Sequence, residues 1–388
     1  MKFSVLIPTR NRLELLKYAV ETVLRQDYSD WELVIADNDS EQDVAAYAET
    51  LRDRRVRYFR TQGFLPVTEN WNFALSKSTG DYVIMLGDDD CLLKGYFKLQ
   101  ADLIERYSRP DFIYTDAFQY AYPGVIPGYP EGLLQIGYTE FLGDSREPFL
   151  LPRAEALKAV GNSMRFRVTF GYNTQHFLVS RRLIDSLSRV GPFFQSPYPD
   201  YYAANALFLT AERALIVPGP MVVIGISSKS FGFYYFNRRE DEGVSFLNNP
   251  VSEQMAAELA QTLLPGSAMN TSWLVAMETL KRNFPSEASF PVDRHRYRLL
   301  QIISIWRNRG IRGLVRVLRR LSLTEILLIS MLAAALAVVR VMPGRLSQAL
   351  YERLVHTLGA YPGFDHRRKS VPYRNILEVF ENLDPDYY

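Results

Sequence analysis

Short apolar runs alternate with amphipathic segments over the first 120 residues of this chain of 388 residues. The apolar runs are short and end at polar or turn-forming residues, as buried strands do. They occupy residues 3–8, 31–36, 56–60, 82–86 and 112–115. Between them, apolar residues recur at helical spacing over residues 12–26, 41–52, 69–78 and 94–107. Strands that alternate with helices predict an α/β fold with a mainly parallel, doubly wound sheet.

Polar residues follow three of the predicted strands, at positions 9–11, 37–40 and 88–90. In a doubly wound sheet, ligands bind beyond the carboxyl ends of the strands, so we expect these segments to meet along one edge. Asn11, Ser40 and Thr68 also precede helical patterns, and their side chains predict N-caps for those helices.

An acidic run, Gly-Asp-Asp-Asp at residues 87–90, comes directly after the apolar strand at 82–86. Three carboxylates at the end of a buried strand are costly to hold together unless a cation neutralises them. Oxygen ligands suit Mg²⁺ or Mn²⁺, and such ions usually accompany a phosphorylated ligand. The run therefore predicts a metal-dependent site for a nucleotide or nucleotide-sugar, although a solvated turn is the simpler alternative.

The pattern changes beyond residue 120. Strands are predicted at 177–180, 214–217 and 221–226, with helices at 181–190 and 200–209, and a Pro-, Gly- and Tyr-rich loop at 122–132. Residues 227–250 are polar and aromatic with little periodicity, which predicts a mobile active-site loop. From residue 251 the pattern is helical nearly to the end. We therefore expect an α/β domain over 1–226 and a helical region over 251–388.

A basic block lies in this helical region. Residues 294–320 contain nine arginines and no acid, whereas the whole chain carries only +2. Arginines alternate with apolar residues there, as in helices that lie on a membrane surface. The apolar run at 326–339 would rise about 21 Å as a helix, short of a bilayer's ~30 Å core. Segment 294–345 thus predicts peripheral membrane contact, and the alternative is a buried helix or a homo-oligomer interface; nucleic acid is a poor match.

The cysteine content and the first residues of the chain indicate the cellular compartment of the protein. The single cysteine, Cys91, excludes an internal disulfide and a cysteine-built zinc site. A strand-like run follows Lys2 at once, so no signal peptide is expected. These features favour the cytoplasm, and the basic block adds the inner face of the cytoplasmic membrane.

Five segments, taken in order, resemble the family-2 glycosyltransferases of the GT-A fold over residues 1–225. These segments are residues 4–12, 32–40, 70–75 and 79–82, together with the acidic run at 87–90. The resemblance implies an enzyme of bacterial surface polysaccharide assembly. Such an enzyme would move a sugar, with inversion, from a nucleotide-diphosphate sugar to a hydroxyl of a saccharide or lipid-linked acceptor.

The resemblance also implies roles for particular residues. Gly87 takes the place of the first Asp in the family's Asp-x-Asp motif, so Asp89 is expected to bind Mn²⁺ or Mg²⁺, with Asp88 and Asp90 as further candidates. Asp200, where a helix begins, is the expected catalytic base. The residues expected to hold the donor are Pro8, Thr9, Arg10, Asp37, Asp39, Asn72 and Asp88.

Each of these residues has a structural alternative. Asp200 is also placed to be an N-cap, and Asp37 and Asp39 are also placed to be turn formers. Arg10 could be a surface charge, and Asn72 could bond only loop backbone. His176 is expected to be a satisfied core histidine. Lys229 and Arg238 are candidates for the diphosphate or for solvated loop charges.

Two alternative functions remain open from the sequence. A scaffold or sugar-nucleotide-binding protein with this fold would bind metal and nucleotide without turnover. A sugar nucleotidyltransferase would need a glycine-rich phosphate loop after the first strand, where this chain has Thr-Arg-Asn-Arg at residues 9–12.

Overall fold

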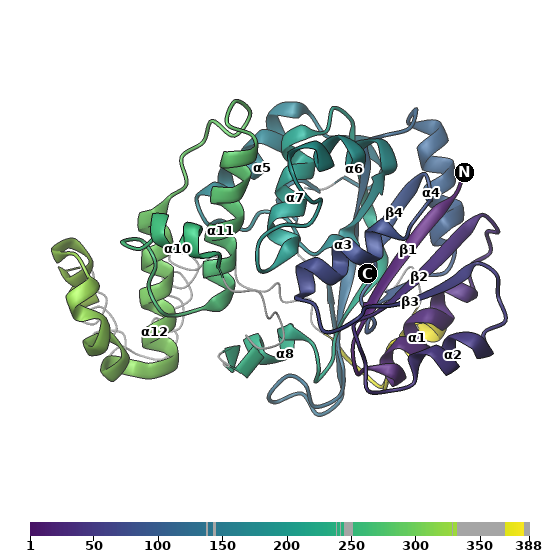
Figure 1. Cartoon of the computed structure of the whole chain (residues 1–388), viewed down its shortest axis with the longest axis horizontal. Coiled ribbons are helices and arrows are strands. Elements are labelled where there is room, and N and C mark those ends of the chain that lie inside the picture. Colours follow the sequence, from purple (N-terminus) through teal and green to yellow (C-terminus); the bar gives the residue numbers. More distant parts are fainter. Residues whose placement is uncertain are drawn as a thin grey trace.

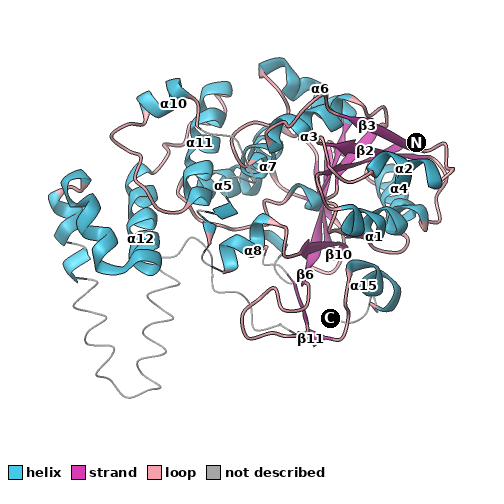
Figure 2. Ribbon diagram, turned by 60° about the horizontal axis from the view of Figure 1, so that its bottom comes forward, coloured by secondary structure: helices cyan, strands magenta, loops and turns pink. Residues whose placement is uncertain are grey.

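A computed structural model of the chain describes residues 1–136, 139–142, 145–237, 239–240, 242–243, 251–327, 329–331 and 369–383. A twisted sheet forms one end of the molecule and a group of helices forms the other (Figure 1). The α/β class expected from the sequence is confirmed, with helices on both faces of the sheet (Figure 2).

Four parallel strands form the part of the sheet that the sequence predicted most directly. They are β1 (Phe3–Thr9), β2 (Trp31–Asp37), β3 (Val56–Arg60) and β4 (Tyr82–Met85). Their order is β4-β1-β2-β3, so β1 and β2 lie next to each other in register. Buried side chains of these strands alternate between the two faces of the sheet, because successive strand residues point to opposite sides. Leu6 and Val34 belong to one hydrophobic core, whereas Val5 and Leu33 belong to the other.

The helices that follow these strands are present, but the N-caps predicted for the first three of them are wrong. The helices are α1 (Leu13–Leu24), α2 (Val44–Thr50), α3 (Val67–Ser76) and α4 (Tyr96–Arg106). Their N-caps are Arg12, Asp43, Pro66 and Gly95.

The residues predicted as caps tie loops together instead. Asn11 Oδ1 accepts from the amide of Glu41, and Ser40 Oγ accepts from the amide of Asn11. Thr68 Oγ1 donates to the carbonyl of Ser196. These hydroxyl and amide groups bridge segments that are distant in the sequence, which a local cap pattern cannot show.

The second half of the sheet is mixed. The strand β9 (Phe177–Ser180) lies antiparallel between β4 and β6 (Phe112–Ala121). Residues 214–217 and 221–226, predicted as two strands, form the single strand β10 (Ala214–Ile226), whose parallel register with β6 shifts around Pro220. The shorter strands are β5 (Cys91–Leu92), β7 (Gly132–Ile136) and β8 (Phe149–Leu150).

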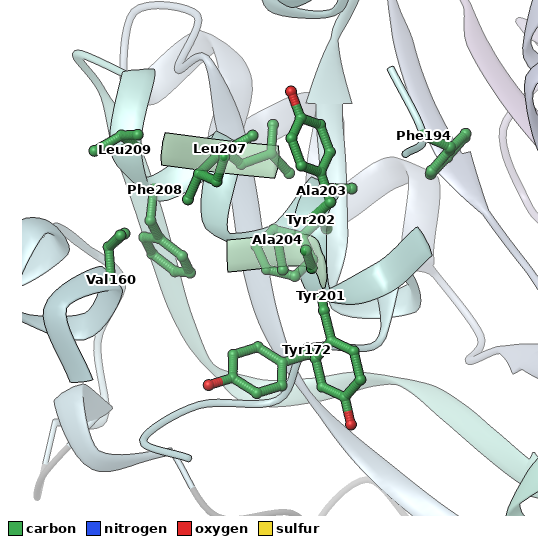
Figure 3. Close-up of a cluster of buried hydrophobic side chains, with 14 of the residues drawn as sticks. Val160, Tyr172, Phe194, Tyr201, Tyr202, Ala203, Ala204, Leu207, Phe208 and Leu209 are labelled. Carbon is green, nitrogen blue, oxygen red and sulfur yellow. The ribbon is translucent and has the colours of Figure 1, made fainter. Parts of the chain in front are cut away.

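The helices of this half are α5 (Arg153–Met164), α6 (Arg181–Leu187) and α7 (Pro199–Thr210), with 3-10 turns η1 (Glu140–Leu142), η2 (Thr174–His176) and η3 (Ser188–Val190). Nearly all of α7 is buried, because it lies between the sheet and the helical region. The close-up of its surroundings shows Tyr172 and Tyr201 together below the helix (Figure 3). Tyr201 also stacks on Trp273, with ring centroids 5.5 Å apart.

The helical region therefore shares a core with the α/β part. Trp273 belongs to α11 (Ala268–Asn283), which packs on α7. The other helices are α8 (Phe231–Phe236), α10 (Glu253–Glu258) and α12 (Arg294–Val317), followed by the 3-10 turn η4 (Leu318–Arg320). None of the helices in the described ranges is both long and apolar enough to cross a bilayer.

Two elements near the chain's end return to the sheet, a feature that the helical pattern did not predict. The strand β11 (Lys369–Val371) pairs antiparallel with β7, and the helix α15 (Ile376–Asn382) packs beside α1. Arg25, the C-cap of α1, forms a 2.6 Å ion pair with Glu381 of α15. Residue 238 and most of the apolar run predicted at 326–339 lie outside the described residues.

Candidate active site

A cavity of about 610 Å³ opens where the carboxyl ends of β1 and β4 meet. Its wall includes the end of β1, the acidic run after β4, the start of α7 and the segment around α8. Met269 of α11 also lines it, so the helical region closes one side. The structure thus brings together all three strand ends expected from the sequence, the second through Asn38, together with Asp200.

Asp88 is the acidic residue held most directly by β1. Its side chain is buried and accepts hydrogen bonds from Thr9 Oγ1 at 2.7 Å and from Arg12 Nη1 at 2.9 Å. Burial raises the pKa of the Asp88 carboxyl, and the Arg12 guanidinium opposes that shift. No separate signal in the sequence marked Arg12, yet it is the one cation that forms an ion pair with the acidic run among the described residues.

Asp90 fixes the turn that carries the acidic run. Its carboxylate accepts from the amides of Gly87 at 2.6 Å and Gly225 at 2.7 Å, and from Gln175 Nε2 at 2.7 Å. Burial, together with the neighbouring Asp89, raises its pKa well above the usual range. Gln175 and Gly225 come from distant segments, so the sequence held no local signal for them.

Close approach of β10 to the acidic run requires glycine at position 225. A Cβ atom on Gly225 would lie 1.8 Å from the carbonyl oxygen of Asp89, which is far inside van der Waals contact. The missing side chain allows the Gly225 amide to reach Asp90.

Asp89 is the residue of the acidic run that has a carboxylate oxygen without a hydrogen-bond donor in the described part of the chain, and it lines the cavity. Its Oδ2 atom accepts from Ser227 Oγ at 2.7 Å. Its Oδ1 atom accepts no hydrogen bond from any residue in the described ranges, unlike both oxygens of Asp88 and Asp90. Asp89 is therefore the acid of the run with a carboxylate oxygen left for a ligand.

The acidic run suits a divalent cation that takes other ligands from elsewhere. Three buried carboxyl groups share one arginine ion pair in the described part of the chain, so a bound cation would favour their ionised forms. No group of three or more His, Cys, Asp or Glu side chains among the described residues converges on one metal position. Mg²⁺ commonly binds one or two carboxylates plus phosphate and water, so a single Asp89 oxygen fits that pattern without a protein-built cage.

Asp200 lies in the same cavity wall as the acidic run, in the first turn of α7. The N-cap of α7 is Tyr198, so the interpretation of Asp200 as an N-cap is wrong. Its Oδ1 atom accepts from the amide of Thr174 at 2.7 Å. Burial raises its pKa to about 6, so burial outweighs the stabilisation of the ionised form expected from the helix N-terminus.

The expected donor residues at the end of β1 line the cavity. Pro8, Thr9 and Arg10 are all in its wall. The Arg10 guanidinium lies 4.1 Å from the ring centre of Phe64 and donates to the carbonyl of Asn38 at 2.7 Å. Asn38 and Phe64 are lining residues that sequence reasoning did not single out.

The two carboxylates expected at the end of β2 do not line the cavity. Asp37 is buried and accepts from Tyr58 Oη at 2.8 Å and from the amide of Ser40 at 3.0 Å. Asp39 pairs with Arg60 at 2.8 Å. Both carboxylates stabilise the loop after β2 and the neighbouring strand β3.

Asn72 also lies outside the set of lining residues. Its amide donates to the carbonyl of Phe194 at 2.9 Å and accepts from the Phe194 amide at 3.1 Å. These bonds hold the loop before α7, which carries Asp200.

Two further candidates have clear positions. His176 is a satisfied core histidine, as expected: its ring stacks on Tyr114, its Nδ1 atom lies 2.9 Å from the carbonyl oxygen of Thr115, and burial lowers its pKa to about 4. Lys229 lines the cavity, and its Nζ donates to the carbonyl of Asn11 at 2.7 Å. Arg238 lies outside the described residues.

The sheet, with an acidic turn after its fourth strand and helices on both faces, defines a GT-A fold. Residues 4–167 match the family model for glycosyl transferase family 2, so this part of the chain is a family-2 glycosyltransferase domain.

Curated relatives carry compatible names. A 97-residue segment is 36% identical to the GalNAc(5)-diNAcBac-PP-undecaprenol β-1,3-glucosyltransferase of Campylobacter jejuni, covering 24% of this chain and 31% of that protein. A 135-residue segment is 28% identical to the putative colanic acid biosynthesis glycosyl transferase WcaA of Escherichia coli, covering 33% of this chain and 48% of that protein. The matched segments thus span less than half the length of both relatives.

Among solved structures, TarS of S. aureus (residues 1–349, in complex with UDP-GlcNAc) is similar to this chain, with 16% sequence identity and a TM-score of 0.49. The similarity covers 81% of this chain and 89% of that one.

Proposed function

We propose that this protein transfers a glycosyl group, with inversion, from a nucleotide-diphosphate sugar to a hydroxyl of a saccharide or lipid-linked acceptor. One observation carries the proposal: a buried run of three acidic residues and a carboxylate with a pKa of about 6 line the same cavity. This arrangement pairs a site for a cation-bound diphosphate with a site for a proton acceptor.

The donor would lie along the end of β1. Arg10, Asn38 and Phe64 offer a cationic, an amide and an aromatic surface to a base and ribose. The diphosphate would lie toward the acidic run, where Asp89 presents its open carboxylate oxygen and Lys229 lines the wall. Asp37, Asp39 and Asn72 would support this site indirectly, through the loops that they hold.

Mn²⁺ or Mg²⁺, held by Asp89 with Asp88 and Asp90 behind it, would neutralise the charge that develops on the departing diphosphate. The protein's own part is to hold that carboxylate in place. Ser227 fixes one oxygen of Asp89, and the bonds to Asp90 fix the turn on which Asp89 sits.

Asp200 would act as the base. The attacking hydroxyl oxygen forms a bond to the anomeric carbon while its proton passes to the Asp200 carboxylate. The bond from that carbon to the diphosphate oxygen breaks, and the nucleoside diphosphate leaves with the electron pair. With a pKa of about 6, Asp200 is largely ionised at pH 7 and still a stronger base than an ordinary aspartate.

The acceptor side of the cavity is aromatic. Trp71, Tyr198 and Tyr234 line it, and Tyr235 and Phe236 of α8 continue the wall. Aromatic rings with polar edges suit sugars, which present apolar faces and hydroxyl rims. The name of the Campylobacter relative describes an undecaprenol-linked substrate, which supports a lipid-linked saccharide as acceptor. We also propose that the reaction takes place in the cytoplasm.

Calorimetric titration with UDP, GDP and dTDP, with and without Mn²⁺, tests the donor site. We expect one nucleotide to bind in a metal-dependent way and Asp89→Asn to abolish that binding. Asp27→Asn, an exposed aspartate far from the run in sequence, is the matched control and should bind as the wild type does. Absence of binding for all three nucleotides would contradict the proposal.

Measurements of turnover distinguish the transferase from the two alternative functions. Release of nucleoside diphosphate from a nucleotide sugar, in the presence of a saccharide acceptor, supports the transferase. Metal-dependent binding with no turnover across acceptors would favour the scaffold, and pyrophosphate formation from a nucleoside triphosphate would favour the nucleotidyltransferase.

A further inference from the structure

Exposed apolar side chains concentrate at one end of the helical region. Nine large hydrophobic residues are exposed in the described part of the chain, and six of them lie between residues 311 and 331. The six are Ile311, Val315, Leu318, Leu323, Leu327 and Met331. Single exposed apolar residues are normal on a protein surface, whereas a cluster of this kind marks a contact site.

These residues form rows beside arginines. Ile311, Val315 and Leu318 recur at helical spacing and make one exposed row. Arg312, Arg316 and Arg319 each follow a member of that row by one position and are also exposed. We call residues 311–331, with these two rows, the basic–apolar face.

The opposite side of the same segment is packed. Leu314 and Val317 join a small core with Leu264, Ile302 and Ile305. Gly310 breaks α12 with φ 59° and ψ −158°, a conformation that is almost confined to glycine. The break and the small core together fix which side of residues 311–317 faces outward.

Charge on the face is almost entirely positive. Glu325 is the only acid between residues 307 and 331, and Arg298 pairs with it at 2.6 Å. Arg312, Arg316 and Arg319 form no ion pair with any residue in the described ranges. A two-fold dimer through this face would bring like-charged rows together with no acid to pair them.

We propose that the basic–apolar face docks the protein peripherally on a bilayer that carries anionic headgroups. The apolar row would enter the boundary between headgroups and acyl chains, and the arginine row would lie at the lipid phosphates. The face lies at the end of the molecule opposite the sheet, where nothing in the α/β part covers it (Figure 1). The proposal does not depend on the transferase activity.

Docking there would also place the cavity near the membrane surface. Arg307, one turn before Ile311 on α12, interacts electrostatically with Tyr235 and Glu240. Tyr235 lines the cavity, and Glu240 accepts hydrogen bonds from Ser267 and Ala268 at the start of α11. The same helix thus links the face to the acceptor side of the cavity.

Flotation of the full-length protein with vesicles tests the proposal. We expect the protein to float with vesicles of phosphatidylcholine and phosphatidylglycerol, and much less with phosphatidylcholine alone. The triple variant R312E/R316E/R319E should lower vesicle binding on the order of a hundredfold, since each basic residue near an anionic surface contributes measurably. Its matched control is R54E/R106E/R189E, at exposed arginines outside the face, which should float as the wild type does.

A second pair of variants tests whether the apolar row inserts into the bilayer. V315D places a charge in the apolar row and should reduce flotation at least tenfold, whereas V190D, at another exposed valine, should not. Circular dichroism and nucleotide titration verify that each variant is folded, and they separate failure of docking from failure of the donor site. Failure of the wild type to float, or equal flotation of R312E/R316E/R319E, would overturn the proposal. The proposal would also be overturned if the wild type formed a dimer that did not float and that the substitutions R312E/R316E/R319E dissociated.

Discussion

Gln175 Nε2 donates a 2.7 Å hydrogen bond to Asp90, while the amide of the preceding residue, Thr174, donates one of 2.7 Å to Asp200. Two consecutive residues of the 3-10 turn η2 therefore hold a carboxylate of the acidic run and the proposed base. The turn is itself fixed, because His176 stacks on Tyr114. Hence one turn sets the spacing between the acidic run and Asp200.

We expect Gln175→Leu to weaken metal-dependent nucleotide binding by roughly 10- to 100-fold. The variant removes a side-chain donor to a buried carboxylate, and a hydrogen bond to a charged group is worth about 1.5–3 kcal/mol. Titration calorimetry measures the change. Gln26→Leu is the control and should leave nucleotide affinity unchanged, because this buried glutamine donates to backbone carbonyls of Thr22, Leu92 and Leu93.

Asp200→Asn should lower kcat by a factor of about 10²–10⁴, the usual range for a general base, with nucleotide affinity retained. The wild-type rate should fall as the pH drops through about 6, because the carboxyl becomes protonated there. The acid limb of the pH–rate profile checks this. Loss of nucleotide binding with unchanged turnover per bound donor would contradict the role.

The same substitution should stabilise the fold. The pKa of Asp200 is raised from 3.8 to about 6 in the folded state, so the folded protein binds more protons than the unfolded chain in that range. The free energy of unfolding therefore falls as pH rises from about 4 to 6, and the full cost, up to about 3 kcal/mol, is present at pH 7. Asparagine has no charge to bury, so Asp200→Asn should unfold at a higher denaturant concentration than the wild type at pH 7 but not at pH 4.

Strands and helices of the first 120 residues were predictable because burial imposes a period on the sequence. The apolar runs at β1, β2 and β4 sit within one or two residues of their predicted bounds. The acidic run could also be placed, since any carboxylate after a buried strand must lie at the strand's carboxyl end.

Side-chain direction at the strand ends could not be predicted. Successive residues at the end of β2 alternate in direction, so Asn38 reaches the cavity whereas Asp37 and Asp39 turn toward Tyr58 and Arg60. Gln175 and Ser227 reach the acidic run from segments 85 and 138 residues away, and no local pattern carries that information. The return of β11 to the sheet is non-local in the same sense.

A buried carboxylate outside the cavity should govern acid stability. Glu32 accepts from Ser4 Oγ at 2.7 Å and pairs with Lys2 and Arg57, and although its burial opposes the shift, these partners lower its pKa from 4.5 to about 2. A lowered folded pKa stabilises the protein above about pH 4.5, and this stabilisation is lost as the pH falls toward 2.

Glu32→Gln should therefore cost about 2–3 kcal/mol at pH 7 and much less near pH 2. Urea unfolding at the two pH values measures the difference. Glu49→Gln, on the exposed surface of α2, should change neither value. An equal loss at both pH values would show that packing, and not charge, sets the contribution of Glu32.

Gly225→Ala should disrupt the acidic run. The added Cβ would lie 1.8 Å from the Asp89 carbonyl oxygen, and a backbone atom cannot move aside as a flexible side chain can. We expect a loss of at least 1–3 kcal/mol in the free energy of unfolding. Nucleotide binding should also be lost, because β10 must shift away and withdraw the amide that holds Asp90.

Gly219→Ala on the same strand is the matched control, since a Cβ there would contact nothing within 4 Å. The control should stay within about 0.5 kcal/mol of the wild type. If Gly225→Ala bound nucleotide as tightly as Gly219→Ala, the close approach of β10 would not be what positions Asp89.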